Sequence, residues 1–259
     1  MKHIILSVIL LTGISWSKIF SQNIYSALHH NREEDFGETF PREVIEKNTF
    51  YNSSGIEINK NKKKLNDQKK LLIEERFNEE GKLEARLIFT YDSTGRHSLN
   101  RKFERWTSFG YVSETAFYEY DQNGFLTKVT DKADNGNIIQ QTVLINNEKG
   151  NPVRLELYDG IGNLLGVETA TYNYETNQAY TAVLNQDGGI LSQDTMTISF
   201  AIKESSEDTY NEKGDLIKSK RYIYEYKYDD FGNWIVMKIY ENVDDKKIRD
   251  RVFKRKLRY

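Results

Sequence analysis

Apolar and polar residues alternate along most of the chain after residue 75. Leu83, Ala85, Leu87, Phe89 and Tyr91 occupy every second position of one segment, and tyrosines do the same over residues 222–228. This period of two is that of a β-strand with one buried face. Because no segment in this region repeats with the 3.6-residue period of a long helix, the pattern predicts an all-β protein.

A short motif, aromatic–Asn/Asp–x–x–Gly, separates the alternating segments. Asn or Asp opens a turn by accepting backbone hydrogen bonds, and glycine takes the position where φ is positive. The aromatic residue ends the strand and can pack across the hairpin. The seven copies begin at Tyr51, Phe77, Tyr91, Tyr120, Tyr158, Tyr210 and Tyr228.

The spacing of the glycines after residue 50 is mostly about 13 residues or twice that, which is the length of one strand and one turn. We therefore expect an antiparallel meander of repeated β-hairpins that forms an extended or curled open sheet, with about 13–16 strands over residues 50–259. The glycines assigned to structural turns are Gly55, Gly81, Gly95, Gly124, Gly150, Gly162, Gly188, Gly214 and Gly232.

The first 21 residues have the layout of a secretory signal peptide. Lys2 and His3 precede the apolar run Ile4–Leu11, and the small residue Ser21 follows a short polar stretch. The run is shorter than the roughly 20 apolar residues that span a bilayer. We expect cleavage near Ser21 and a periplasmic or secreted protein with no integral membrane segment.

Three regions follow from this division. Residues 1–21 are the signal peptide, residues 22–49 an N-terminal arm that is partly irregular, and residues 50–259 the β domain. Within the arm, residues 42–47 fit one helical turn or a strand. The run Lys60–Lys64 is expected to be a solvated loop or insertion.

Composition excludes several classes of protein. The chain has no cysteine, so it has no disulfide, no thiolate metal site, no thiol nucleophile and no lipobox for an acyl anchor. Its formal net charge of −2 gives no overall attraction to nucleic acid. An aromatic content of 13% is too high for a disordered chain.

The tract Tyr224–Trp234 resembles the YD-repeat (RHS-repeat) family of bacterial proteins, and Tyr91–Arg96 and Tyr120–Leu126 are similar. The similarity covers roughly residues 50–259 and is that of the short secreted form typical of Bacteroidetes-type bacteria. Larger members build spiralling β-strips, and some enclose a toxin. This chain has too few repeats for a large shell, so the resemblance implies a free, open or partly curled strip.

Candidate catalytic and metal-binding groups are sparse. His29 and His30 are adjacent and read as solvated residues, and His97 lacks a surrounding motif. The segment starting at Asp131 fails as a calcium loop at its third and twelfth positions. Asp229 and Asp230 point apart as neighbours on a turn. With no nucleophile, phosphate-loop or dinucleotide motif, we expect no catalytic residue, metal or cofactor, and no enzyme.

Two surface features admit a binding role. Aromatic residues on one strand face are predicted to pack across the sheet or, alternatively, to stack a sugar or a peptide. The last 15 residues hold eight basic residues and read as a charged edge strand, or else as a patch for an anionic polymer. The proposed aromatic platform consists of Tyr222, Tyr224, Tyr226, Tyr228 and Trp234.

The sequence thus favours an exported, non-enzymatic β-repeat protein that binds a polysaccharide or a protein, or has a structural role, at the bacterial cell envelope. One alternative, implied only by the resemblance, is a component or remnant of an RHS-type toxin-delivery system. The other is a hydrolase on a β scaffold, which would need two acidic side chains converging in a cleft.

Overall fold

The computed structural model describes residues 23–30, 34, 36–185, 187–198, 208–243 and 246–259. These residues form one antiparallel, open sheet of 17 strands and one short helix, α1 (Ile24–Leu28). The predicted all-β meander is therefore confirmed, and 16 of the strands lie after residue 50.

Successive strands are neighbours in the sheet, as a chain of hairpins requires. The exception is the pair β12 and β13, which do not pair with each other and form the two edges of the sheet. Strand β1 joins the two ends of the chain, because it pairs with both β2 and β17. The strands are β1 (Glu43–Asn52), β2 (Gly55–Leu65), β3 (Leu71–Phe77), β4 (Leu83–Tyr91), β5 (Ser98–Thr107), β6 (Gly110–Tyr120), β7 (Leu126–Ala133), β8 (Ile138–Asn146), β9 (Pro152–Asp159), β10 (Leu164–Asn173), β11 (Gln178–Leu184), β12 (Ile190–Thr197), β13 (Thr209–Tyr210), β14 (Leu216–Lys218), β15 (Tyr222–Tyr228), β16 (Trp234–Val243) and β17 (Lys246–Arg258).

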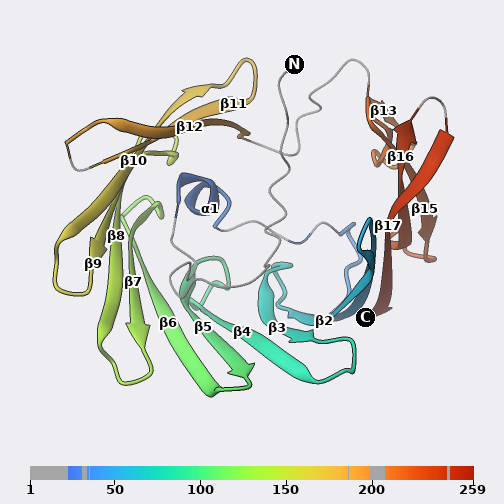
Figure 1. Cartoon of the computed structure of the whole chain (residues 1–259), viewed down its shortest axis with the longest axis horizontal. Helices are drawn as coiled ribbons and strands as arrows, with labels where there is room; N and C mark the ends of the chain where they lie inside the picture. The colour runs from blue at the N-terminus through green and yellow to red at the C-terminus, as the bar shows by residue number, and fades with distance from the viewer. Residues whose placement is uncertain (1–22, 31–33, 35, 186, 199–207, 244–245) are drawn as a thin grey trace.

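The sheet curls around a central space that contains α1 (Figure 1). The curl brings the first and last strands together, and their register pairs Glu43 with Arg258 and Phe50 with Arg251. The expectation that the basic C-terminal segment is an edge strand is therefore wrong, because β17 has a partner on each side. The open edges are instead β12 and β13, at residues 190–197 and 209–210.

The repeated turns have a common geometry. Asp121 Oδ1 accepts hydrogen bonds from the backbone N–H groups of Asn123 and Phe125, both at 2.9 Å, and the N–H of Gly124 donates to the carbonyl of Asp121. Gly124 has a φ of +82° and Gly232 a φ of +84°, a region that side chains with a Cβ avoid. Every glycine assigned to a turn from the sequence has a positive φ.

The tyrosine that precedes several turns has a second role. Its hydroxyl donates to the carbonyl at the start of a neighbouring strand: Tyr91 to Leu71 at 2.8 Å, Tyr120 to Ser98 at 2.8 Å, and Tyr172 to Pro152 at 2.6 Å. A buried carbonyl without a partner is costly, so this bond explains why tyrosine recurs at the position.

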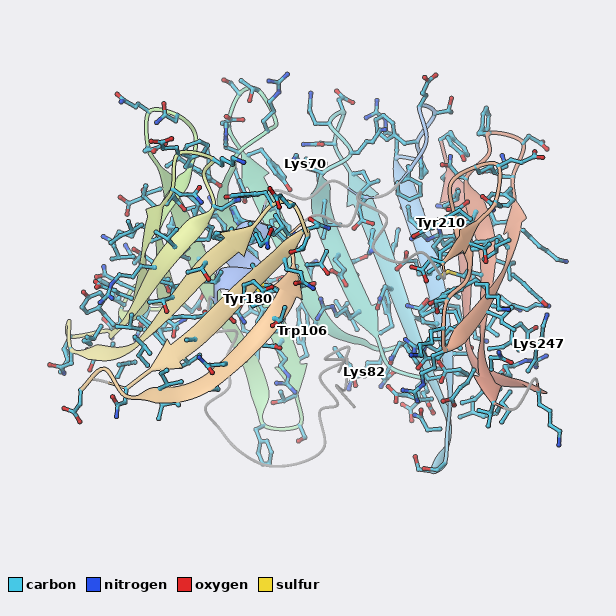
Figure 2. All side chains as sticks on the ribbon, turned by 90° about the horizontal axis from the view of Figure 1, so that it is seen from above. Lys70, Lys82, Trp106, Tyr180, Tyr210 and Lys247 are labelled. Atoms are coloured by element: carbon cyan, nitrogen blue, oxygen red, sulfur yellow. The ribbon has the colours of Figure 1, made fainter. Side chains whose placement is uncertain are left out.

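The hairpin turns lie at two ends of the sheet. We call one the Phe109 end, with the β1–β2, β3–β4, β5–β6, β7–β8, β9–β10, β11–β12 and β14–β15 turns, and the other the Asp121 end, with the β2–β3, β4–β5, β6–β7, β8–β9, β10–β11, β13–β14 and β15–β16 turns. In Figure 2, Lys70 marks the upper, Asp121 end, and Lys82 and Lys247 lie toward the lower, Phe109 end. At the Asp121 end a Cβ on Gly124 would lie 2.9 Å from His97 Nε2, whereas Gly81 and Gly136 at the Phe109 end have no atom within 4 Å of that position.

The main apolar core lies inside the curl. Asn23 caps α1 by accepting from the N–H of Ser26 at 2.8 Å, and the N–H of Ile24 donates to Glu168 at 2.8 Å. Ile24 is fully buried against side chains of β6 to β10. No described helix is long and apolar enough to cross a membrane. The cluster comprises Ile24, Ala116, Tyr118, Leu126, Val129, Leu144, Leu155 and Ala170.

One interpretation of a charged run was wrong. The run Lys60–Lys64 is not a solvated loop but the second half of β2, where alternation turns Lys63 inward and leaves Lys64 exposed. The charged residues concealed a strand there, because their acidic partners lie far away in sequence. Of the two alternatives for residues 42–47, one helical turn or a strand, the structure shows the strand, because β1 begins at Glu43.

Candidate functional site

Charged side chains line part of the interior and are held by the N-terminal arm. Lys63 Nζ lies 3.3 Å from Glu34 Oε1 and 3.4 Å from Glu46 Oε2, and its neighbour across the sheet is Glu74. Burial opposes the charge on Lys63, but these three carboxylates outweigh it and raise its pKa. We call Glu34, Glu46, Lys63, Glu74 and Arg255 the Lys63 cluster.

Arg255 on β17 connects this cluster to the aromatic residues. Its Nε donates to Glu46 at 3.2 Å, and its guanidinium lies 3.4 Å from the ring centre of Trp234 and 5.2 Å from that of Phe36. A guanidinium between two rings is stabilised by cation–π attraction. The contacts fix Trp234 as a packing partner of Arg255.

A second group of charges lies farther along the interior. Glu114 on β6 and Asp131 on β7 are only 8% and 5% exposed. Burial raises the pKa of both carboxyl groups, the charge of Asp131 raises that of Glu114 further, and Arg101 opposes the shift in each. Asp131 also accepts from Gln140 Nε2 at 2.9 Å. Two acids do come together here, as a hydrolase would require, but they are covered by protein.

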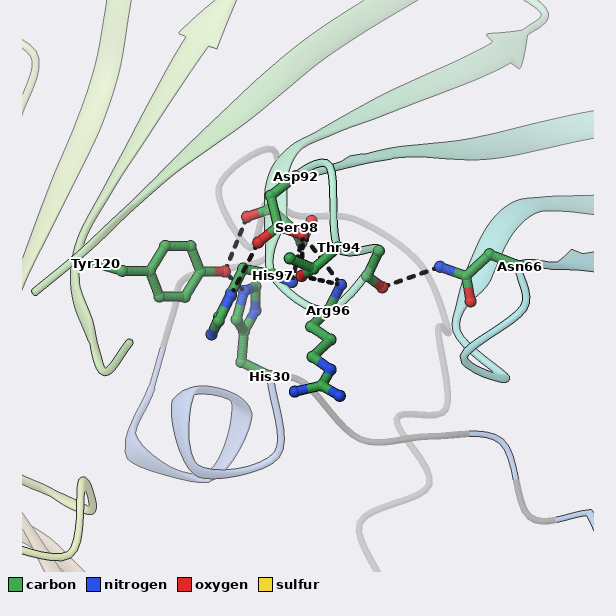
Figure 3. A network of polar contacts seen from close by, with 9 residues as sticks. His30, Asn66, Asp92, Thr94, Arg96, His97, Ser98 and Tyr120 are labelled. Atoms are coloured by element: carbon green, nitrogen blue, oxygen red, sulfur yellow. Dashed lines mark hydrogen bonds and ion pairs between the residues drawn. The ribbon is translucent and has the colours of Figure 1, made fainter. Parts of the chain in front are cut away.

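His30 joins the arm to the sheet beside this group. Its Nε2 lies 2.8 Å from the hydroxyl of Tyr120, and its ring lies 4.2 Å from that of Tyr118 (Figure 3). Burial, together with the positive charges of Arg101 and Lys70 and the nearby His97, lowers the pKa of His30 to about 4. The expectation of a solvated histidine was therefore wrong, because the arm folds back into the curl.

Acidification should weaken the fold through His30. The His30 ring is protonated near pH 6.5 in the unfolded chain but only near pH 4 in the folded chain. The stability given by neutral His30 is therefore complete above pH 6.5 and is lost as the pH falls, by up to about 3 kcal/mol. Urea unfolding from pH 7 to pH 4.5 should show a smaller loss for His30→Gln than for the wild type. Equal losses would contradict this role. Protonation of Glu114 and Asp131 stabilises the folded state on acidification, but it does so equally in both proteins and cancels in the comparison.

Asp92 and His97 form a polar pair at the Asp121 end (Figure 3). Asp92 Oδ1 accepts from Thr94 Oγ1 at 2.8 Å, and its Oδ2 lies 3.1 Å from His97 Nδ1. These bonds, led by that of Thr94, lower the pKa of Asp92. The pair resembles the orienting half of a catalytic triad, but the Asp92 oxygens also hold the turn, which accounts for them structurally.

Replacing Asp229 with asparagine should leave the turn intact. Asp229 Oδ1 accepts from the N–H groups of Phe231 and Asn233 at 3.0 and 2.9 Å, and Asn211 Oδ1 makes the same two bonds in its own turn at 3.0 and 2.9 Å. We expect Asp229→Asn to change the free energy of unfolding by less than about 1 kcal/mol. A larger loss would show that the carboxylate itself is needed.

The structure places the predicted aromatic platform on one face, but its groups are engaged. The hydroxyl of Tyr226 donates to Leu216 O at 3.1 Å, and that of Tyr228 donates to Asp215 at 2.6 Å. The Tyr226 and Tyr228 rings stack at 5.9 Å, and Trp234 faces Tyr228 across the sheet. All five aromatic side chains, Tyr222, Tyr224, Tyr226, Tyr228 and Trp234, are half-buried. These contacts favour packing over ligand stacking.

Sequence reasoning missed an aromatic group on the β5–β6 hairpin. The rings of Trp106 and Tyr111 lie 5.6 Å apart, the Arg86 guanidinium lies 5.5 Å from the Trp106 ring, and Phe109 projects from the turn. The aromatic density of residues 106–111 was the available signal. This turn lacks the Asn/Asp-x-x-Gly motif that marks the other predicted turns.

No group of three or more histidine and acidic side chains that could hold a metal ion occurs within the described part of the chain. No protein-family model matches this chain, and no curated protein matches it.

Solved structures offer distant likenesses. A porin-like protein from Bacteroides uniformis aligns with a TM-score of 0.45 and 10% identity over 84% of this chain and 96% of that chain. A porin-like protein from Bacteroides vulgatus gives 0.35 and 9% over 85% and 99%. An outer-membrane lipoprotein-sorting protein domain from Vibrio parahaemolyticus gives 0.19 and 10% over 90% and 88%. Scores this low carry no argument about function, and the resemblance to YD-repeat proteins stays a prediction.

Proposed function

We propose that the chain is an exported, non-enzymatic β-repeat protein that acts as a binding or structural module at the bacterial cell envelope. One observation carries the proposal: the two clusters of charged groups inside the curl are buried and paired with the protein's own residues. Glu114 and Asp131 lie beside Arg101, and Lys63 lies among three carboxylates. Such groups stabilise a scaffold and leave recognition to the outer surface.

The proposed export rests on the composition of residues 1–21, which lie outside the described residues. In a Gram-negative host, the whole chain should be recovered from the periplasm or the medium with Gln22 as its first residue. The control variant Leu10→Arg/Leu11→Arg interrupts the apolar run and should stay in the cytoplasm. Cytoplasmic retention of the unaltered chain would refute the proposed export.

A binding screen tests the second half of the proposal. The exported chain would be applied to a glycan array and to envelope fractions, where we expect a bound polysaccharide or protein and no turnover of it. If envelope polysaccharide is instead cleaved, and Asp131→Asn abolishes cleavage while the fold is retained, the hydrolase alternative replaces this proposal.

A further inference from the structure

The most exposed large apolar side chains gather at one end of the sheet. Phe109 is 90% exposed and Ile161 87%, and both occupy hairpin turns of the Phe109 end. A single exposed apolar residue is ordinary, but several of the most exposed ones at the same end of a molecule indicate a contact surface. The six highest exposures among the described residues belong to Phe109, Ile161, Leu191, Ile56, Ile190 and Val112, all at this end.

The two most exposed apolar side chains at this end project free of their neighbours. Phe109 is 90% and Ile161 87% exposed, although the backbone of the β9–β10 turn itself contacts β8, where a Cβ on Gly160 would overlap Ile138 O. Tips of adjacent hairpins are about 10 Å apart, since neighbouring strands are spaced by about 4.8 Å. The apolar side chains therefore form separate projections rather than a continuous groove.

The turn that carries Phe109 is fixed in shape. Thr107 Oγ1 donates to Gly110 O at 3.1 Å and accepts from the N–H of Phe109 at 3.2 Å. Trp106 and Tyr111 lie one step behind Phe109 on the paired strands. An apolar tip followed by Trp and Tyr is the order of side chains found where a protein enters the interfacial layer of a membrane.

Charge at this end is mixed. Glu79, Glu80 and Lys82 lie in or beside one turn, and Lys220 and Arg221 lie in another. The main contribution to binding at this end is therefore the burial of apolar side chains, and not attraction to a strongly charged partner.

We propose that the Phe109 end rests on a lipid bilayer, with the tips at Phe109 and Ile161 inserted into its interfacial layer. A rigid partner would need a separate socket for each isolated tip, whereas a fluid lipid surface accepts them without complementary shape. This inference goes beyond the proposed function, because an exported binding module need not touch lipid.

The absence of cysteine allows a site-specific test on the full chain. Phe109→Cys and Ile161→Cys would each be labelled with an environment-sensitive fluorophore and mixed with phosphatidylcholine vesicles. The matched control is Phe231→Cys, because Phe231 is 56% exposed in a turn at the opposite end. We expect an at least twofold rise in emission for the labels at positions 109 and 161 and none for the label at position 231.

Each other outcome counts against the proposal. Vesicle binding with the position-109 and position-161 labels unchanged would mean that another segment, such as residues 1–21, holds the lipid. A rise that depends on protein concentration and occurs without vesicles would identify a second copy of the chain as the partner. As a further check, Phe109→Ser/Ile161→Ser should lower vesicle affinity at least tenfold while Phe231→Ser leaves it unchanged, and equal affinities would overturn the proposal. The proposed export would stand in all these cases.

Discussion

Lys63→Met should lower the free energy of unfolding by about 3–5 kcal/mol, because the substitution leaves buried carboxylates without their shared cation. Lys63 Nζ lies 3.3 Å from Glu34 and 3.4 Å from Glu46, and the side chain of Glu46 is almost fully buried. Methionine fills much of the same volume, so the loss reports charge rather than a cavity. Urea unfolding at pH 7 measures it.

The adjacent Lys64 provides the matched control. It lies on the same strand but is exposed, so Lys64→Met should change the free energy of unfolding by less than about 0.5 kcal/mol. In the Lys63→Met background, Glu34→Gln removes one uncompensated charge and should restore part of the loss. A small effect of Lys63→Met, or no recovery in the double variant, would show that water already screens the cluster.

The strands and turns were predictable because both signals are local. Alternation assigns the two faces of a strand such as Leu83–Tyr91. A turn is specified within a few residues, as Asp121 and Gly124 specify the turn that contains them. In a meander, sequence neighbours are also neighbours in space, so the strand order followed from the turns.

The pairing of the first strand with the last was not predictable in the same way. Strands β1 and β17 pair residues some 200 positions apart, for example Glu46 with Arg255, and no local pattern records that pairing. The role of Lys63 was hidden for the same reason, because Glu34 and Glu46 lie on other segments. A run of lysines looks solvated until its acidic partners are known.

The aromatic residues show a third limit. Alternation correctly placed Tyr222 to Tyr228 on one face, but it could not reveal that their hydroxyls meet Leu216 and Asp215. The period of two also placed Trp234 on the same strand face as Val236. An irregular register between β15 and β16 instead places Trp234 opposite Tyr228, whereas Val236 lies opposite Lys227. A β-bulge of this kind reverses the facing of one residue and has no reliable sequence signal.

Two turn glycines, one at each end of the sheet, differ in what surrounds them. At the Asp121 end, a Cβ added to Gly150 would overlap the Phe125 ring from the preceding turn at that end, whereas the surroundings of Gly136 at the Phe109 end are open. Their φ angles are nearly equal, +78° and +84°, so the backbone strain of any side chain should be similar. Comparing the two glycines therefore separates backbone strain from contact between turns.

Gly150→Val should lower the free energy of unfolding by about 3–5 kcal/mol, and Gly136→Val by about 1–3 kcal/mol. The smaller value is the strain of a β-branched residue at positive φ, and the difference is the cost of displacing Phe125. Adding Phe125→Ala to Gly150→Val tests this directly, because the double variant should lose less than the sum of the single losses. Urea unfolding of all four variants measures these terms. Equal losses at both glycines, or strict additivity in the double variant, would show that the turns of the Asp121 end do not support one another.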